Sequence, residues 1–245
     1  MHRIVFRSRA AGSVVALLVT VAGGARAAVV VPGPPPLDVR SIADRVHSFT
    51  VAVHARAFVS SGAAGENAAL SEAVNSASGI LVGDGLVLTT LSAIAFQRSD
   101  GQLTPPAMIE VVTDQAGLVP ARFLMGDPGL DLALLQLPDQ LHELEGATLA
   151  PSDPAEGESM IAIGAEGDAV YVVGVSLDRV EFGFGRGARL FLNRVLPPSF
   201  SGGPLFDADG RIAGISTRAG SDSGFALPAS VVRTLLDRIR GATRI

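Results

Sequence analysis

The sequence predicts an all-β protein with one C-terminal α-helix, and three observations support this fold class. From residue 48 onward, short apolar runs rich in Val and Ile alternate with Gly, Pro and Asp. Runs of this length bounded by turn residues are typical of strands. Many short strands with regular turns favour a barrel or a sandwich over a helical or parallel α/β fold. Only residues 229–240 repeat their apolar side chains at helical spacing.

One helix, one long loop, one linker and nine strands are predicted. A helix is predicted over 229–240, with Gly241 as its stop. Residues 60–77 are small and polar without alternation, which predicts a long loop, functional or disordered, with a helical turn near residues 70–74. Residues 138–158 are rich in turn formers and are the expected linker between two β units. The predicted strands are residues 49–58, 79–82, 86–90, 108–113, 131–137, 159–163, 169–177, 188–193 and 211–217.

The N-terminus has the pattern of an export signal. Residues 1–9 carry three arginines and no acidic residue, the run 10–22 is apolar, and residues 25–27 read Ala-Arg-Ala. A basic start, a short apolar core and a small-residue exit predict a signal peptide over 1–27, cleaved after Ala27. The alternative is an uncleaved anchor, although the run is shorter than the about 20 apolar residues that span a membrane. We therefore expect a periplasmic or secreted protein without an integral membrane segment after cleavage.

Residues 28–45 contain four prolines and predict a stiff, extended spacer ahead of the folded domain. The domain itself is expected over 46–240. The chain contains no cysteine, so its fold must rest on its core rather than on disulfides.

Charge and ligand types exclude several function classes. Cleavage of the signal would leave 15 basic against 24 acidic residues, because four of the 19 arginines lie in it and no acidic residue does. Nucleic acid and anionic membranes are not expected partners, since no basic footprint exists. The four histidines show no ligand spacing, and we predict neither a metal nor a cofactor.

The most informative segment is Pro198-Ser199-Phe200-Ser201-Gly202-Gly203-Pro204-Leu205. It resembles the nucleophile loop of chymotrypsin-like serine proteases, usually G-[DN]-S-G-G-[PA]-L. Glycines there allow a tight turn that exposes the serine and directs its N–H toward a developing oxyanion. Taken alone, the segment is also compatible with an ordinary β-turn.

Four further segments, in the order of the family, resemble HtrA/DegP-like proteases. They are SGILVGDGLVLTTLSAI (78–94), DPGLDLALLQL (127–137), ESMIAIGAEGDAVYVVGVSLDRV (158–180) and RIAGISTRAGSDSGFALP (211–228). The resemblance covers about 46–240 and implies two six-stranded antiparallel β-barrels with a cleft between them. The first barrel would span 46–140, the second 141–228, and the helix 229–240. Since the printed sequence ends after this helix, we expect a member without a PDZ domain.

The resemblance also implies the site residues. Ser201 matches the nucleophile and Asp131 the aspartate that orients the imidazole, although Asp131 could merely cap a turn. Ser92 stands where the family has its catalytic histidine, and no histidine lies between His54 and His142. Ser199 replaces the family's oxyanion-hole glycine, whose N–H would act together with that of Ser201.

These departures predict an impaired catalyst. A serine hydroxyl cannot accept a proton near neutral pH, so Ser92 cannot activate Ser201. Phe200 is bulky where the family has Asn or Asp. We therefore expect a pseudoprotease that binds a peptide or protein. The alternatives are an active serine endopeptidase with His47 or His54 as its base, and a purely structural or inhibitory domain.

Overall fold

The computed structural model describes residues 15–21, 24–30, 37–61, 69–97, 103–183, 187–217 and 224–242. The chain divides into two units, Met1–Pro36 and Leu37–Ile245. In the first unit, β1 (Val15–Val21) and β2 (Gly24–Val30) pair as an antiparallel hairpin. The basic residues 1–9 and the four prolines of the predicted spacer lie outside the described residues.

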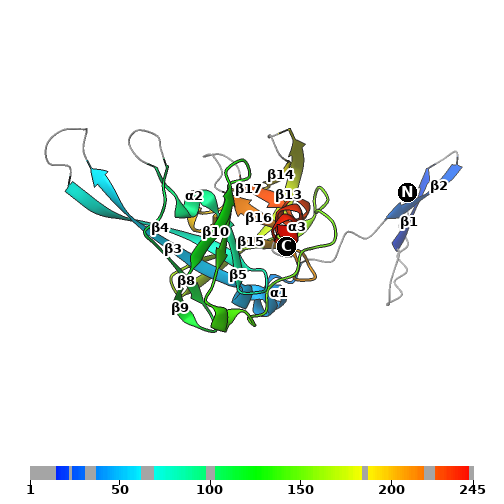
Figure 1. The fold of residues 1–245 in the computed structure, drawn as a ribbon. Coiled ribbons are helices and arrows are strands. Elements are labelled where there is room, and N and C mark those ends of the chain that lie inside the picture. The colour runs from blue at the N-terminus through cyan, green and yellow to red at the C-terminus, as the bar shows by residue number, and fades with distance from the viewer. Residues whose placement is uncertain are drawn as a thin grey trace. The chain divides into compact units, whose positions relative to one another are not determined.

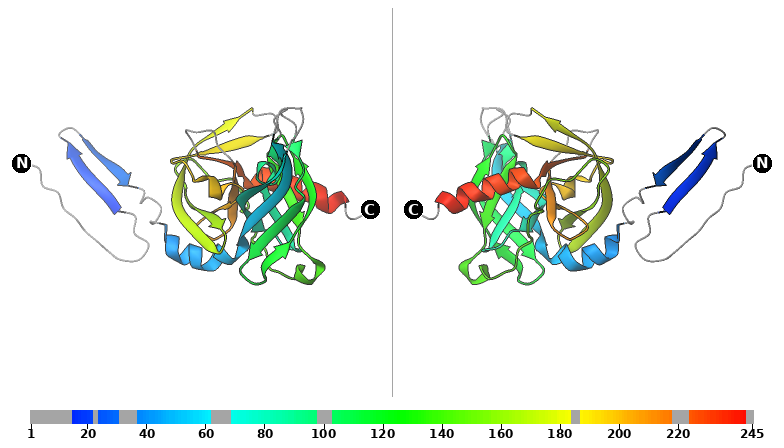
Figure 2. Two further views of the ribbon diagram at one scale, coloured as in Figure 1. Left: turned by 90° about the vertical axis from the view of Figure 1, so that its left-hand side faces the viewer. Right: turned by 90° about the vertical axis from the view of Figure 1, so that its right-hand side faces the viewer.

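The second unit contains two β bodies, which lie side by side in both views of Figure 2. The first is a seven-stranded sheet in the order β10-β11-β5-β4-β3-β8-β9. β9 and β10 follow each other directly in sequence yet occupy opposite edges, so the sheet must curl to bring its edges near each other. The expected closed, six-stranded first barrel is thus a curled half-barrel. Its strands are β3 (Thr50–Ser61), β4 (Ala69–Leu81), β5 (Leu86–Thr90), β8 (Met108–Thr113), β9 (Gly117–Pro120), β10 (Arg122–Asp127) and β11 (Leu132–Gln136).

The second body is a closed six-stranded antiparallel barrel, which confirms the prediction for this half. The strands run around it in the order β12-β13-β14-β17-β16-β15. Buried residues from all six strands fill its interior, among them Met160, Leu177 and Leu205. The strands are β12 (Ser159–Glu166), β13 (Ala169–Phe182), β14 (Ala188–Leu192), β15 (Pro204–Phe206), β16 (Ile212–Thr217) and β17 (Gly224–Pro228).

Short helices connect or cover these sheets. The predicted C-terminal helix is confirmed as α3 (Ala229–Ala242), and it continues past Gly241. Figure 1 shows it against the barrel strands β16 and β17. The remaining short elements are α1 (Val39–Val46), η1 (His47–Phe49), α2 (Leu91–Ile94), β6 (Phe96–Gln97), β7 (Leu103–Thr104), η2 (Asp139–Leu141) and η3 (Pro198–Phe200).

Helix α1 differs from the predicted spacer, because residues 39–45 are helical rather than extended. The carboxylate of Asp38 accepts a hydrogen bond from the N–H of Ser41, which caps the helix start. Ile42 and Val46, one helical turn apart, are both buried. The prolines upstream obscured this short amphipathic pattern in the sequence.

The predicted loop over 60–77 is wrong for its second half, because residues 69–77 belong to β4. Strands β3 and β4 form a long hairpin without a register shift, which extends away from the body in Figure 1. Over residues 71–76 the side chains are exposed or half-buried on both faces, so the sequence there lacks the alternation of a half-buried strand. Residues 70–74 are therefore strand and not a helical turn. Residues 62–68 lie outside the described residues.

One apolar cluster joins both β bodies and two helices. It contains Ile42 from α1, Leu88 from β5, Ile163 from β12 and Leu235 from α3, all buried. Separate clusters fill the interior of the half-barrel and of the closed barrel. The loops that carry the candidate site therefore extend from a shared core.

Candidate functional site

Strand pairing brings Asp131 beside the end of β5. Leu132, the first residue of β11, pairs with Thr90, the last residue of β5. Asp131 has a φ of 54°, a left-handed conformation that is uncommon outside glycine. Its carbonyl accepts the N–H of Leu91 at 3.1 Å, which fixes the turn into α2.

Ser92 and Asp131 form a two-point contact. The Oγ of Ser92 donates to Oδ2 of Asp131 at 2.8 Å, and its backbone N–H donates to Oδ1 at 2.7 Å. Both residues are half-buried. The two positions that the resemblance assigns to the aspartate and the histidine are thus adjacent. The hydroxyl of Ser92 donates a hydrogen bond to the carboxylate of Asp131.

The hydroxyl of Ser201 bonds to a different partner. Its Oγ lies 3.1 Å from Oγ1 of Thr90, a residue with no exposed surface. Ser201 itself follows η3 and is half-buried. The predicted site residues therefore form two separate pairs, Ser92 with Asp131 and Ser201 with Thr90. The sequence interpretation did not single out Thr90.

The loop around Ser201 forms backbone hydrogen bonds within itself. The N–H of Ser201 donates to the carbonyl of Pro198 at 3.0 Å, which closes the turn of η3. This is the N–H that an oxyanion hole would require to be free. Gly202 has a φ of 82°, and a Cβ there would clash with the carbonyl of Ser78 and the hydroxyl of Thr89, so only glycine fits.

Ser78 holds this loop from the half-barrel side. Its N–H donates to the carbonyl of Ser201 at 2.8 Å, and its Oγ donates to the carbonyl of Ser199 at 2.5 Å. The same Oγ accepts the N–H of Ala165 at 2.7 Å. Ser78 has no exposed surface. Sequence reasoning missed this role, although Ser78 begins one of the segments that carry the resemblance.

Phe200 is part of the barrel core rather than of an open pocket. It is 2% exposed and packs beside β12. A Cβ on Gly164 would lie 2.7 Å from its ring, so that glycine makes room for the ring. Ser199 is half-buried and its carbonyl, as described, bonds to Ser78.

The described histidines bond elsewhere. Nδ1 of His47 lies 3.1 Å from the carbonyl of Ala43, and Nδ1 of His54 lies 3.0 Å from Oγ of Ser76. Nε2 of His142 lies 2.9 Å from Nε2 of Gln136, at the far end of β11 from Asp131. Within the part of the chain that the structure describes, no imidazole forms a hydrogen bond or an ion pair with Ser201 or Asp131.

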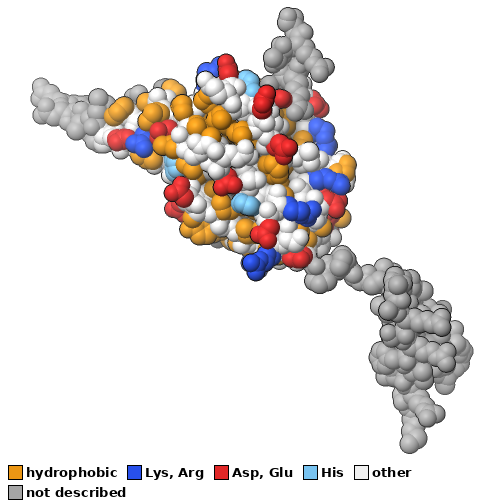
Figure 3. Space-filling model, turned by 90° about the horizontal axis from the view of Figure 1, so that it is seen from below, with side chains coloured by type: hydrophobic (Ala, Val, Ile, Leu, Met, Phe, Trp, Pro, Cys, Tyr) orange, Lys and Arg blue, Asp and Glu red, His pale blue; other side chains and the backbone are white. Residues whose placement is uncertain are grey.

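Three further observations concern metal ligands, surface charge and helix length. Among the described residues, no group of three or more His, Cys, Asp or Glu side chains could hold a metal ion. On the face shown in Figure 3, acidic and basic side chains are interspersed with apolar ones, and no continuous basic surface is visible. None of the helices in the described ranges is long and apolar enough to cross a membrane.

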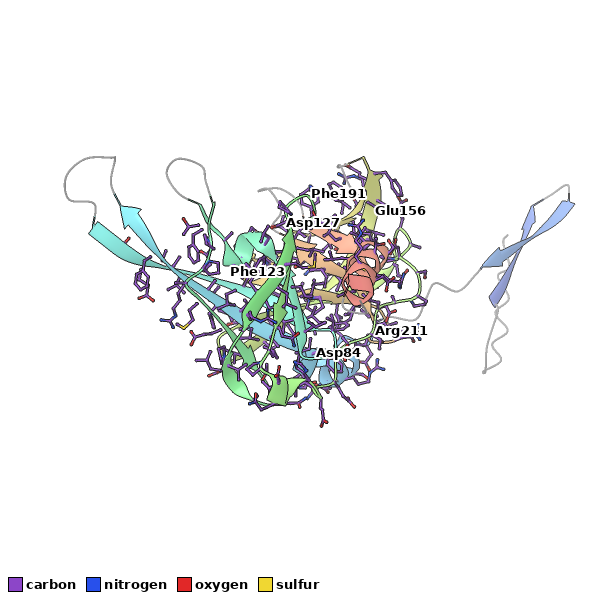
Figure 4. All side chains as sticks on the ribbon, in the orientation of Figure 1. Asp84, Phe123, Asp127, Glu156, Phe191 and Arg211 are labelled. Carbon is purple, nitrogen blue, oxygen red and sulfur yellow. The ribbon has the colours of Figure 1, made fainter. Side chains whose placement is uncertain are left out.

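Hydrogen bonds to the carboxylate of Asp127 hold the loop before Asp131. Asp127, at the end of β10 in Figure 4, accepts the N–H groups of Gly129 and Leu130 at 2.9 and 3.2 Å. This turn determines where β11 begins and therefore where Asp131 stands. The geometry around Asp131 is thus that of a carboxylate held by its own loop and by Ser92.

Comparison with known proteins identifies the family and the fold. A family model described as a trypsin-like peptidase domain matches residues 77–215, which is more than half of the 245 residues. The matched range includes Ser92, Asp131 and Ser201. No curated protein sequence matches the chain significantly.

Solved structures share the fold at low sequence identity. A variant of the HtrA-type protease AlgW with a decapeptide is 21% identical, with a TM-score of 0.71, and the match covers 83% of this chain and 67% of that one. The same AlgW variant with a tripeptide is 20% identical, with a TM-score of 0.65, and the match covers 82% of this chain and 63% of that one. The active form of the Rv3671c protease from M. tuberculosis is 17% identical, with a TM-score of 0.65, and covers 84% and 87%. This chain spans about two thirds of the length of the AlgW structures. It belongs to the trypsin-like peptidase domain family, and its fold is that of HtrA-type proteases.

Proposed function

We propose that this chain is an exported, catalytically impaired serine protease homologue that binds an extended peptide or protein segment without cleaving it. One observation carries the proposal. The carboxylate of Asp131 is occupied by the hydroxyl of Ser92, at the position where the resemblance places the catalytic histidine. Because a hydroxyl cannot take the proton of Ser201 near neutral pH, the nucleophile stays a weak alcohol.

Two further contacts support impaired chemistry. The hydroxyl of Ser201 is bonded to Thr90, and its N–H is bonded to the carbonyl of Pro198. An acyl-transfer site needs that hydroxyl to reach a base and that N–H to bind an oxyanion. In this chain both groups are already bonded to other partners.

An unpaired strand edge beside Ser201 supports peptide binding. The N–H of Ser78 points away from β3 toward Ser201, so the backbone groups of Ser76, Val74 and Glu72 point the same way, because alternate residues of a strand do. Among the described strands, β5 pairs with β4 only at Ile80 and Leu81. An extended peptide can add to such an edge through main-chain hydrogen bonds.

Export and location are part of the same proposal. The basic, apolar and small-residue order of residues 1–27 supports a secretory signal, and with it a periplasmic or secreted protein. A fold without cysteine is compatible with such a compartment, since it needs no disulfide.

A fluorophosphonate serine probe together with a casein cleavage assay tests the proposal. We expect no Ser201-dependent labelling and no cleavage by the purified protein, while β-casein, an extended chain, still binds in biolayer interferometry. Ser201→Ala is the matched control. Cleavage that disappears in Ser201→Ala would overturn the impaired-protease proposal and favour an endopeptidase with an unconventional base. Absence of casein binding would overturn the peptide-binding part.

A gain-of-function variant tests the role of Ser92. Ser92→His places an imidazole beside Asp131, where it would displace the Ser92 hydroxyl. We expect at most a trace of labelling. The hydroxyl of Ser201 would still be hydrogen-bonded to Thr90, and its N–H to the carbonyl of Pro198. Full activity of Ser92→His would mean that the histidine is the only missing component.

A further inference from the structure

Strand β3 continues beyond the end of its neighbour β8. The pairing of β8 with β3 stops at Arg56. Pro105 and Pro106 lie just before β8, where this pairing would continue, and a proline has no N–H to donate to a sheet. β3 nevertheless runs on to Ser61 and pairs there with β4 alone among the described strands. Residues 57–61 of β3 therefore form a free edge, which we call the β3 edge.

Two residues of the β3 edge direct their backbone groups outward. The N–H of Ala107 donates to the carbonyl of Arg56 at 2.7 Å, so the backbone groups of Arg56 point away from β4. Because alternate residues of a strand point the same way, those of Phe58 and Ser60 do so too. No described strand pairs with them. The hairpin that carries this edge extends away from the body in Figure 1.

The β3 edge has none of the features that usually protect a free strand. Natural edges are blunted by charged side chains, prolines or bulges. Residues 57–65 contain no charged residue and no proline, although 18% of the chain is charged. The β3–β4 pairing shows no register shift up to Ser61. A regular, uncharged edge of this kind is a template for pairing with another strand.

Exposed apolar side chains lie beside this edge. Phe58 is 64% exposed, Val74 54% and Met108 43%. Val74 and Met108 both pair with Arg56, so their side chains share its face of the sheet. Phe58 follows two residues later in β3 and lies on the same face. A strand added to the β3 edge would therefore bury part of the Phe58 ring as well as form main-chain hydrogen bonds.

A second copy of this chain suits the β3 edge better than a free peptide does. A two-fold axis at Val59 would set Phe58 opposite the partner's Ser60 and pair every outward backbone group of the edge. The lack of charge permits this symmetric contact, because a charged residue near the axis would face its own copy. The partner strand is already ordered by its own hairpin, whereas a free peptide would lose entropy for very few hydrogen bonds.

We infer that the β3 edge is a self-association surface, through which two copies pair antiparallel into a four-stranded sheet in the order β4-β3-β3-β4. The two Phe58 residues would be diagonal neighbours across the axis, about 7–8 Å apart, within reach of each other's rings. The contact is much smaller than the about 20–30 residues a side of a standard interface, so the dimer is weak and forms at high protein concentration. It uses the opposite edge of the hairpin from the peptide edge of β4 and does not depend on the proposed function.

Sedimentation equilibrium of the purified protein over a wide range of concentration tests the inference. We expect a reversible monomer–dimer equilibrium. Phe58→Lys and Phe58→Glu should each weaken dimerisation about tenfold or more, because like charges meet near the axis. An equimolar mixture of the two variants should dimerise again, since opposite charges then face each other. This rescue requires residue 58 of one copy to lie near residue 58 of the other.

Three further variants are controls. Phe182→Lys changes a phenylalanine that is 80% exposed on the closed barrel, and dimerisation should not change. Phe58→Pro removes an N–H that points away from β4, so dimerisation should be lost while circular dichroism still shows a folded chain. Val74→Pro blocks the other edge of the hairpin and should leave dimerisation unchanged.

Several results would overturn the inference. The first is a protein that stays monomeric over the whole concentration range. Dimerisation of Phe58→Lys as strong as that of the unchanged chain would also contradict it, and so would a mixture of the two charge variants that remains monomeric. A dimer that persists in Phe58→Pro but is lost in Val74→Pro would place the contact on β4 instead.

Discussion

The hydroxyl of Ser92 donates to Oδ2 of Asp131 at 2.8 Å, while the N–H of the same residue donates to Oδ1 at 2.7 Å. A single serine thus satisfies both oxygens of the carboxylate. The contact gives Asp131 a structural role that does not require catalysis. The strength of the contact can be measured as a change in the free energy of unfolding.

Ser92→Ala should lower the free energy of unfolding by about 1 kcal/mol, because it removes one hydrogen bond to a half-buried carboxylate. Urea denaturation followed by circular dichroism measures this. The matched control is Ser230→Ala, which removes the exposed bond to Asp153 and should cost less. Equal losses of unfolding free energy in both variants would mean that the contact with Asp131 stabilises the fold no more than an exposed hydrogen bond does.

Ser78→Ala should lower the free energy of unfolding more than Ser92→Ala does. The variant leaves the N–H of Ala165 and the carbonyl of Ser199 without their partner at a fully buried position, which costs about 1–3 kcal/mol. The same denaturation series measures it. A loss of stability smaller than that of Ser92→Ala would contradict the role of Ser78 in holding the loop around Ser201.

Phe200→Ala should destabilise the chain by about 3–5 kcal/mol, because a buried ring is replaced by a cavity. Phe182→Ala is the control, since Phe182 is 80% exposed and its loss should stay within about 0.5 kcal/mol. If this holds, restoring the family's residue at position 200 carries a stability cost. A small loss in Phe200→Ala would contradict the core role of the ring.

Gly202→Ala should prevent folding or lower the yield of soluble protein sharply. The position combines a φ of 82° with a steric clash against Ser78 and Thr89. Gly183→Ala separates the two effects, because Gly183 has a φ of 107° but nothing within 4 Å of an added Cβ. We expect about 1–2 kcal/mol for Gly183→Ala from backbone strain alone. A similar loss of stability in both variants would argue against a steric clash at position 202.

Two proline substitutions test the peptide edge of β4. Val74→Pro removes an N–H that points away from β3, so the hairpin should remain folded while β-casein binding is lost. Ala73→Pro removes an N–H that points toward β3 and should destabilise the hairpin itself. Circular dichroism reports on folding and biolayer interferometry on binding. Undiminished casein binding by a folded Val74→Pro variant would place the peptide elsewhere.

The strands that alternate or run continuously apolar were predictable from the sequence. Residues 86–90 and 108–113 match β5 and β8 residue for residue. β10 and β15 were missed because Arg122–Asp127 mixes polar and apolar residues and Pro204–Phe206 is very short. Hairpin β3–β4 was missed at its end because neither of its faces is fully buried there.

The site was predictable as a set of positions but not as a set of contacts. Motif resemblance placed Asp131, Ser92 and Ser201 in one region. It did not predict that the hydroxyl of Ser201 bonds to Thr90. That contact depends on how β5 and the loop after η3 meet in space, and no local pattern around Thr90 encodes it.

The apolar cluster shared by α1, both β bodies and α3 has a consequence for motion. Two domains with separate cores could open and close on a ligand, as a hinge does. Here a common core crosses the seam, so opening it would expose buried Leu, Ile and Phe side chains to water. The second unit should therefore unfold in one cooperative transition. Any ligand that it binds would meet a preformed, rigid surface with little reorganisation on binding.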